Sequence, residues 1–124
     1  MTIIEAIDKI DASKPNTYEQ VEKIRWLSNL EWTIKREIID THEGGEKIEF
    51  NGYTEDTPIE TQLIVPAPYD ELYIKWLEAQ INYANGEINK FNASIAMYNT
   101  YLTSFANYYN RNHMPIKKTG IKYF

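Results

Sequence analysis

Histidine and cysteine, the residue types that most often bind metals, are scarce in this sequence, and their spacing predicts no metal site. The two histidines, His42 and His113, have no second ligand at the helical spacing of a metal site. The chain has no cysteine, so it has no disulfide framework and no thiolate metal site. We therefore expect neither a bound metal nor a cofactor.

Carboxylates and serines also lack the neighbours that catalysis needs. The carboxylate pair at 55–56 lies in a polar stretch and the pair at 70–71 precedes a helix, so solvation and capping explain them better than acid–base catalysis. The glycine pair at 44–45 is not followed by the Gly-Lys-Ser/Thr of a phosphate-binding loop. We therefore expect that the protein is not an enzyme. No nucleophile-elbow context surrounds the serines that we considered, which are Ser13, Ser28, Ser94 and Ser104.

Charge is distributed unevenly along the 124 residues, a length that suits one domain. Residues 1–87 hold all 18 acids and 8 of the 13 bases, a net charge of −10, whereas residues 88–124 hold 5 bases and no acid. One interpretation is head-to-tail association of copies, and the other is that folding mixes these charges in space. The overall charge of −5 disfavours binding to nucleic acid.

No stretch of the sequence predicts secretion or membrane insertion. Residues 1–10 are too polar for the apolar core of a signal peptide. No run approaches the roughly 20 apolar residues that span a bilayer. We expect a soluble, intracellular protein.

The longest predicted element is the stretch 68–111. Its apolar residues recur at alternating steps of three and four residues. This period is that of one helix face. Asn85-Gly86 often marks a turn, but the pattern crosses the pair in phase, so we predict one long helix that is kinked at Gly86. Its length implies that part of it packs on another chain. The stripe consists of Ile74, Leu77, Ile81, Ala84, Ile88, Phe91, Ile95, Tyr98, Leu102, Phe105 and Tyr109.

Two further lines of residues flank this stripe and make a candidate interface. One line is small and rich in amides, which permits close helix approach, and the other contains tyrosine and methionine, which suit contact surfaces. A wide core face within one chain explains the pattern equally well, and the two interpretations stay open. The candidate interface residues are Tyr83, Asn89, Asn92, Met97, Asn99, Tyr101, Tyr108, Arg111, Lys117 and Lys118.

The remaining elements complete a mainly α prediction: a helical bundle with one long C-terminal helix plus a small β-hairpin. Helices are predicted at 2–11 and 17–40, each opened by a capping box, Thr2 with Glu5 and Thr17 with Gln20. Alternating residues predict a hairpin insertion at about 46–65. The predicted organisation is one helical domain, 1–111, followed by a basic tail, 112–124.

Several sequence runs resemble small proteins of tailed bacteriophages and of prophages in Gram-positive bacteria, which are encoded among the head and head–tail joining genes. These proteins are similar in size and helical content to connector (adaptor) proteins, which form a ring under the portal. The resemblance covers about residues 40–115. The runs are THEGG at 41–45, PAPYDELY at 66–73, WLEAQINYANGE at 76–87, FN at 91–92, MYN at 97–99 and YYNRNHMP at 108–115.

This resemblance implies a virion structural protein, a head–tail connector that oligomerises and docks on the portal or on a neighbouring ring. Its partners would be its own copies, in a ring, and the portal or other head and tail proteins. It would meet DNA only in passage and would not bind a membrane. It would be made in the cytoplasm of the host and then reside at the virion head–tail junction. The alternative is a soluble helical adaptor, such as a phage assembly or regulatory factor.

Overall fold

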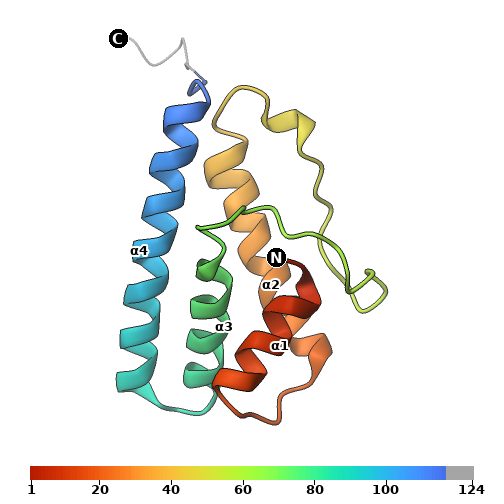
Figure 1. Ribbon diagram of the computed structural model, residues 1–124, viewed down its shortest axis with the longest axis vertical. Coiled ribbons are helices and arrows are strands. Elements are labelled where there is room, and N and C mark those ends of the chain that lie inside the picture. Colours follow the sequence, from red (N-terminus) through yellow and green to blue (C-terminus); the bar gives the residue numbers. More distant parts are fainter. Residues whose placement is uncertain (117–124) are drawn as a thin grey trace.

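The chain folds into a bundle of four α-helices within residues 1–116, which are the residues that the structure describes. In this computed structural model the helices are α1 (Ile3–Ser13), α2 (Gln20–Ile34), α3 (Glu71–Ala84) and α4 (Ile88–Asn112). Figure 1 shows α3 and α4 as a helical hairpin, with α4 along one side of the molecule and α1 on the other. The prediction of a mainly α bundle is confirmed.

The first helix begins with the predicted capping box. The Thr2 amide donates to Glu5 Oε1 at 2.8 Å, and the Glu5 amide donates to Thr2 Oγ1 at 3.2 Å, so two free backbone donors are satisfied. The helix ends at Ser13, two residues before Pro15. Its isoleucines, spaced three or four residues apart, enter the core between α2 and α3.

The second helix begins later than predicted, and its expected capping box is wrong. It starts at Gln20, and the N-cap residue Glu19 makes no capping hydrogen bond with its side chain. Asn16 organises the preceding turn instead, because its Oδ1 accepts from the Tyr18 amide at 3.1 Å and its Nδ2 donates to Asp11 at 3.0 Å. At the other end α2 continues into a π-helical turn, η1 (Lys35–Ile39), so the helical path ends close to the predicted residue 40.

The predicted β-hairpin at 46–65 is wrong. Apart from a short 3₁₀ turn, η2 (Gly45–Lys47), this segment has neither helix nor strand, and it lies across the helices (Figure 1). The backbone groups that a hairpin would pair are bonded to the helices and the N-terminus instead. The Tyr53 amide donates to Ser28 Oγ and the Ile64 amide donates to Glu31, each at 2.9 Å. The Leu63 amide donates to the Met1 carbonyl, also at 2.9 Å. The carbonyls of Ile59 and Thr61 accept from the first amides of α1.

The predicted long helix is also wrong, because the chain reverses at Asn85-Gly86. Gly86 has a φ of 75°, the left-handed conformation that glycine adopts without a Cβ penalty. Its amide donates to the Tyr83 carbonyl at 3.0 Å, and the next amide, of Glu87, donates to the Asn82 carbonyl at 2.9 Å. These two bonds make a Schellman motif, which ends α3.

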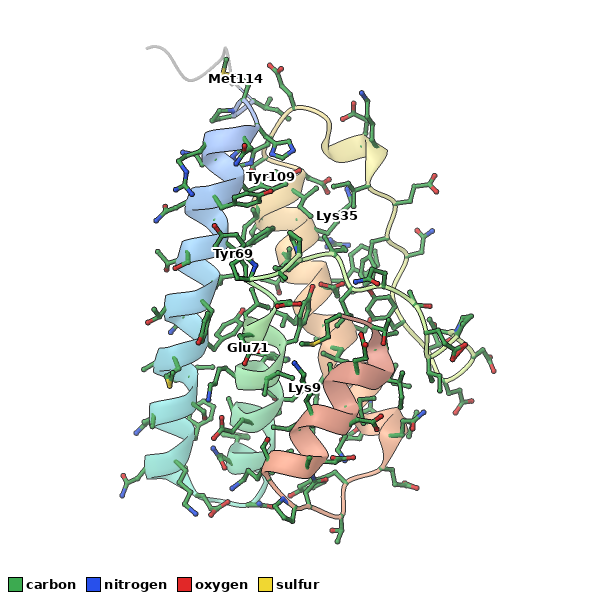
Figure 2. The ribbon with its side chains drawn as sticks, viewed as in Figure 1. Lys9, Lys35, Tyr69, Glu71, Tyr109 and Met114 are labelled. Carbon is green, nitrogen blue, oxygen red and sulfur yellow. The ribbon has the colours of Figure 1, made fainter. Side chains whose placement is uncertain are left out.

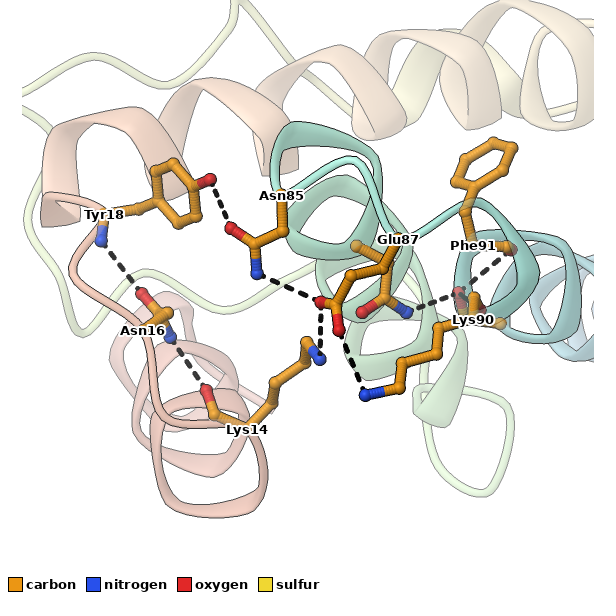
Figure 3. Close-up of polar contacts among 9 residues, drawn as sticks. Lys14, Asn16, Tyr18, Asn85, Glu87, Lys90 and Phe91 are labelled. Atoms are coloured by element: carbon orange, nitrogen blue, oxygen red, sulfur yellow. Dashed lines mark hydrogen bonds and ion pairs between the residues drawn. The ribbon is translucent and has the colours of Figure 1, made fainter.

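Polar side chains fasten this turn to the end of α1 (Figure 3). The Glu87 carboxylate accepts from Lys90 at 3.0 Å and from Asn85 at 3.2 Å, and Lys14 lies 3.2 Å away. These contacts, first that with Lys90, lower the pKa of Glu87 to about 2. The Tyr18 hydroxyl donates to Asn85 Oδ1 at 2.6 Å, so the turn is held from two directions.

Reversal at Gly86 lets the apolar stripe cover itself. Leu77 and Ile81 on α3 and Phe105 on α4 are fully buried where the two helices face each other and α2. Ile88, beside the turn, is 55% exposed and is the least covered apolar residue of the stripe on α4. The stripe therefore does not require a second chain to bury it, and that part of the prediction is corrected.

Replacing Gly86 by alanine is expected to destabilise the fold by about 1–2 kcal/mol, the cost of the left-handed conformation for a residue with a Cβ. No atom lies within 4 Å of the added Cβ, so the loss comes from the backbone alone. Gly86→Asn should lose less, because asparagine tolerates this conformation better. Urea unfolding measures both values, and an alanine variant as stable as the wild type would contradict the described turn.

Candidate interaction surface

Glu31 on α2 is 0% exposed, and burial raises the pKa of its carboxyl group. Its carboxylate accepts from the Tyr73 hydroxyl at 2.5 Å, the Tyr53 hydroxyl at 2.7 Å and the Ile64 amide at 2.9 Å. The Tyr73 hydroxyl also accepts from the Val65 amide at 2.9 Å. All three donors come from other parts of the fold, so the cluster joins α2 to α3 and to the 46–65 segment.

Sequence reasoning did not single out Glu31, although a signal was present. The buried face of α2 and η1 repeats at steps of three and four, through Ile24, Leu27, Ile34 and Ile38. Position 31 falls in that line, and a carboxylate on an apolar face needs hydrogen-bond donors from elsewhere in the fold. The spacing thus identifies a buried acid but not its partners.

Two surface pockets on the described residues differ in their lining. One, of about 410 Å³, is lined by Met1, Glu5, Asp8, Lys9 and Asp70. The other, of about 200 Å³, is mainly apolar and lies against the end of α4, where Tyr109 points from α4 toward α2 (Figure 2). In residues 1–116 no three side chains of the metal-binding types gather in one place. Among the same residues, no helix combines the length and hydropathy of a membrane span.

One side of α4 has no neighbouring element within residues 1–116, because α4 packs mainly on α3 and touches η1. Side chains project from its far side with no other element beside them (Figure 2). We name this surface the outer face of α4. It consists of the exposed residues Asn89, Asn92, Ala93, Ala96, Met97, Asn99, Thr100, Thr103, Ser104 and Asn107, with Lys90 and Arg111 near its ends. Asn110 is also exposed, but its Oδ1 lies 3.1 Å from His42 Nε2, so this residue is not part of the outer face.

The amide-bearing residues predicted for an interface lie together on this face. Asn89, Asn92 and Asn99 are exposed along one line of α4, and Arg111 is exposed at its end. Met97, which is 46% exposed, lies at one margin of the face. Lys117 and Lys118 lie outside the described residues.

The predicted tyrosines divide into two groups. Tyr101 and Tyr108 are half-buried and pack against the core along the same margin as Met97, and the Tyr108 ring lies 4.9 Å from the ring of Tyr69. Tyr83 lies apart, in the last turn of α3, and is 65% exposed. The structure therefore brings the predicted residues of α4 to one side of the molecule but leaves Tyr83 at the turn.

The outer face of α4 is distinguished by its lack of charge. Between Lys90 and Arg111 the helix has no ionisable acid or base other than tyrosine, and its exposed residues are amides, hydroxyls, alanines and one methionine. The acids of the chain all precede residue 88, and many of them lie in α1 and in the 46–65 segment. Both of these parts lie on the side of the bundle opposite α4 (Figure 1). The surface therefore suits contact with another helix, because small side chains permit close approach and amides can pair across it.

Comparisons with known proteins identify no relative. No protein-family model matches the chain, and neither a curated protein nor a solved structure matches it. The resemblance to phage connector proteins and the partners that it implies stay predictions.

Replacing Tyr53 by phenylalanine is expected to lower the free energy of unfolding by about 1.5–3 kcal/mol, the range for a hydrogen bond to a charged group. The matched control is Tyr83→Phe, because that ring is exposed and makes no hydrogen bond with its hydroxyl within residues 1–116. Urea unfolding should separate the two variants. Equal stability of the two would show that the Glu31 cluster does not fasten the 46–65 segment.

Stability should also depend on pH through Glu31. Burial raises the pKa of its carboxyl above the ordinary 4.5, although hydrogen bonds, first that from Tyr73, act in the opposite direction. The folded protein therefore binds more protons than the unfolded chain above pH 4.5. The stability of the wild type relative to Glu31→Gln should be greatest below that pH and should decline as pH rises through the folded pKa. A relative stability that rises with pH, measured by urea unfolding in a buffer series, would contradict this assignment.

Proposed function

We propose that this protein is a structural subunit that works through protein–protein contacts, and that the outer face of α4 is its contact surface. The observation that carries the proposal is the absence of charge along an exposed helix face between Lys90 and Arg111. A helix face that meets only water ordinarily carries charged residues, whereas the centres of protein interfaces are depleted in them. The amides and small residues of α4 fit a packed contact better than a solvated surface.

Copies of the same chain are the partners that the charge distribution favours. The outer face of α4 has no acid, Lys90 at its start is paired with Glu87 at 3.0 Å, and Arg111 lies near its end. Contact between two different surfaces of identical subunits is heterologous, and it closes into a ring when the rotation between neighbours permits. This arrangement brings a face without acids toward an acidic surface and avoids like-charge repulsion.

The particular role that we propose is that of a head–tail connector in a tailed bacteriophage. It is supported by the resemblance of residues 40–115 and by a small helical body with one uncovered side. A ring of this acidic chain around the DNA path would let DNA pass without adhering. Such a subunit is made in the host cytoplasm, docks on the portal or on a neighbouring ring and remains at the head–tail junction.

The 46–65 segment and the basic tail are not assigned to the contact surface. The 46–65 segment is bonded to α1, α2 and the N-terminus, and it does not form the predicted hairpin that could pair with a neighbour. The basic tail begins in the described part of the chain, but residues 117–124, which carry three of its lysines, lie outside it. The contact surface is therefore assigned to α4 alone.

A negative charge at the centre of the outer face should weaken association. Asn99→Asp places a carboxylate on α4 that must be desolvated and that faces an acidic neighbour, so we expect association to weaken by about tenfold or more. Asn29→Asp is the matched control, because Asn29 is an exposed asparagine on α2. Sedimentation velocity over a concentration series measures the association of both variants and of the wild type.

Two results would overturn the proposal at different levels. A wild-type protein that stays monomeric at high concentration, and also with its portal present, would exclude self-association. Absence of the protein from purified tailed particles would exclude the connector role and leave an assembly or regulatory factor.

A further inference from the structure

The chain contains two Asn-Gly pairs, Asn51-Gly52 and Asn85-Gly86, and the sequence alone does not distinguish them. Asn-Gly is the dipeptide in which asparagine loses its amide most readily, because glycine has no side chain to hinder its own nitrogen. The reaction requires that nitrogen to reach the asparagine Cγ. A pair reacts in a folded protein when both the asparagine side chain and the following amide are free to move.

The structure restrains Asn85-Gly86 at every atom that the reaction uses. Asn85 Oδ1 accepts from the Tyr18 hydroxyl at 2.6 Å, and Asn85 Nδ2 donates to Glu87 at 3.2 Å (Figure 3). The Gly86 amide, which would be the nucleophile, donates to the Tyr83 carbonyl at 3.0 Å within the Schellman motif. Attack on Cγ would require the Gly86 amide to leave the Tyr83 carbonyl and the Asn85 side chain to move from the position in which Tyr18 and Glu87 hold it.

Asn51-Gly52 differs in each of these respects. Asn51 is exposed, and its side chain has no hydrogen-bond partner among residues 1–116. The Gly52 amide likewise donates to no group in that part of the chain. The pair lies in a part of the 46–65 segment that forms neither helix nor strand, and the first anchored amide after it is that of Tyr53.

We propose that Asn51 is a site of spontaneous deamidation and isoaspartate formation in the folded protein, and that the fold protects Asn85. The Gly52 nitrogen, after losing its proton to water or hydroxide, forms a bond to Asn51 Cγ. The Cγ–Nδ2 bond then breaks, and the side-chain nitrogen leaves as ammonia. Water opens the resulting succinimide at either carbonyl, which yields aspartate or isoaspartate. The net change is the gain of one water and the loss of one ammonia, without oxidation or reduction.

The modification falls between two anchors of the 46–65 segment. Phe50 packs edge-on against Trp32 at a ring distance of 4.8 Å, and Tyr53 is bonded to Ser28 and Glu31. Isoaspartate passes the main chain through the side-chain carbon, which lengthens the path between these anchors. We therefore expect the isoaspartyl form to be less stable than the aspartyl form, because only the former shifts the position of Tyr53 relative to α2.

The test incubates the folded protein at mildly alkaline pH and follows both sites by mass spectrometry after digestion. A protease that cleaves after lysine and arginine releases Asn51 in peptide 48–75 and Asn85 in peptide 76–90. Peptide 76–90 also contains Asn82 and Asn89, so fragment ions assign its conversion to Asn85. We expect peptide 48–75 to convert several-fold faster than peptide 76–90 in the folded protein. In urea, where the hydrogen bonds are lost, the two rates should approach each other. Equal rates in the folded protein, or a faster Asn85, would overturn the proposal.

Variants connect the modification to its structural effect. Asn51→Gln should abolish conversion in peptide 48–75, because attack on glutamine closes a larger and slower ring, and Asn51→Asp reproduces the charge without altering the backbone. The aged wild type should unfold at lower urea than Asn51→Asp, and isoaspartyl methyltransferase labelling should mark the aged wild type more strongly. Gly52→Ala is unsuitable, because φ is +90° there and the added Cβ would lie 3.3 Å from Trp32 Nε1. Aged protein that contains aspartate without isoaspartate would overturn the isoaspartyl half of the proposal.

Discussion

The carboxylate of Glu31 joins three parts of the molecule that are distant in sequence. It lies on α2 and accepts hydrogen bonds from a tyrosine on α3 and from two groups of the 46–65 segment. A buried carboxylate is costly unless donors surround it, so its presence requires those donors to stay in place. Glu31 therefore fixes the connecting segment to α2 and α3, together with the bonds of that segment to Ser28, Met1 and the start of α1.

The same joint explains why one side of the bundle remains available. The connecting segment is drawn to α2 and to the start of α1, and so α4 is left to pack on α3 and on the η1 turn. Half of α4 then has no neighbour, and that half carries amides and small residues in place of charges. One face of α4 contributes Tyr98, Phe105 and Tyr109 to the core, and the other face is the proposed contact surface.

Local interactions were the most predictable part of the fold. The capping box of Thr2 and Glu5 and the end of α1 before Pro15 each depend on residues within one turn of helix, and both were predicted correctly. The turn at Gly86 is local too. It was not predicted, because the apolar residues keep their helical spacing across Asn85-Gly86 and so favoured one continuous helix over a turn. The prediction of a hairpin was wrong for a different reason. The alternating residues fit a strand, but the backbone amides of Tyr53 and Ile64 donate to side chains of α2 and not to a partner strand.

By itself the sequence determined the helical class, the apolar faces of the helices, the cap of α1 and the uncharged character of residues 91–110, because each follows from residue type and helical period. The tertiary structure alone decided that α3 and α4 fold back on each other, that Glu31 is satisfied by Tyr53 and Tyr73, and which of two identical Asn-Gly pairs is restrained. These outcomes depend on contacts between residues far apart in the chain. A periodic pattern specifies which face of a helix is buried, but not what covers it.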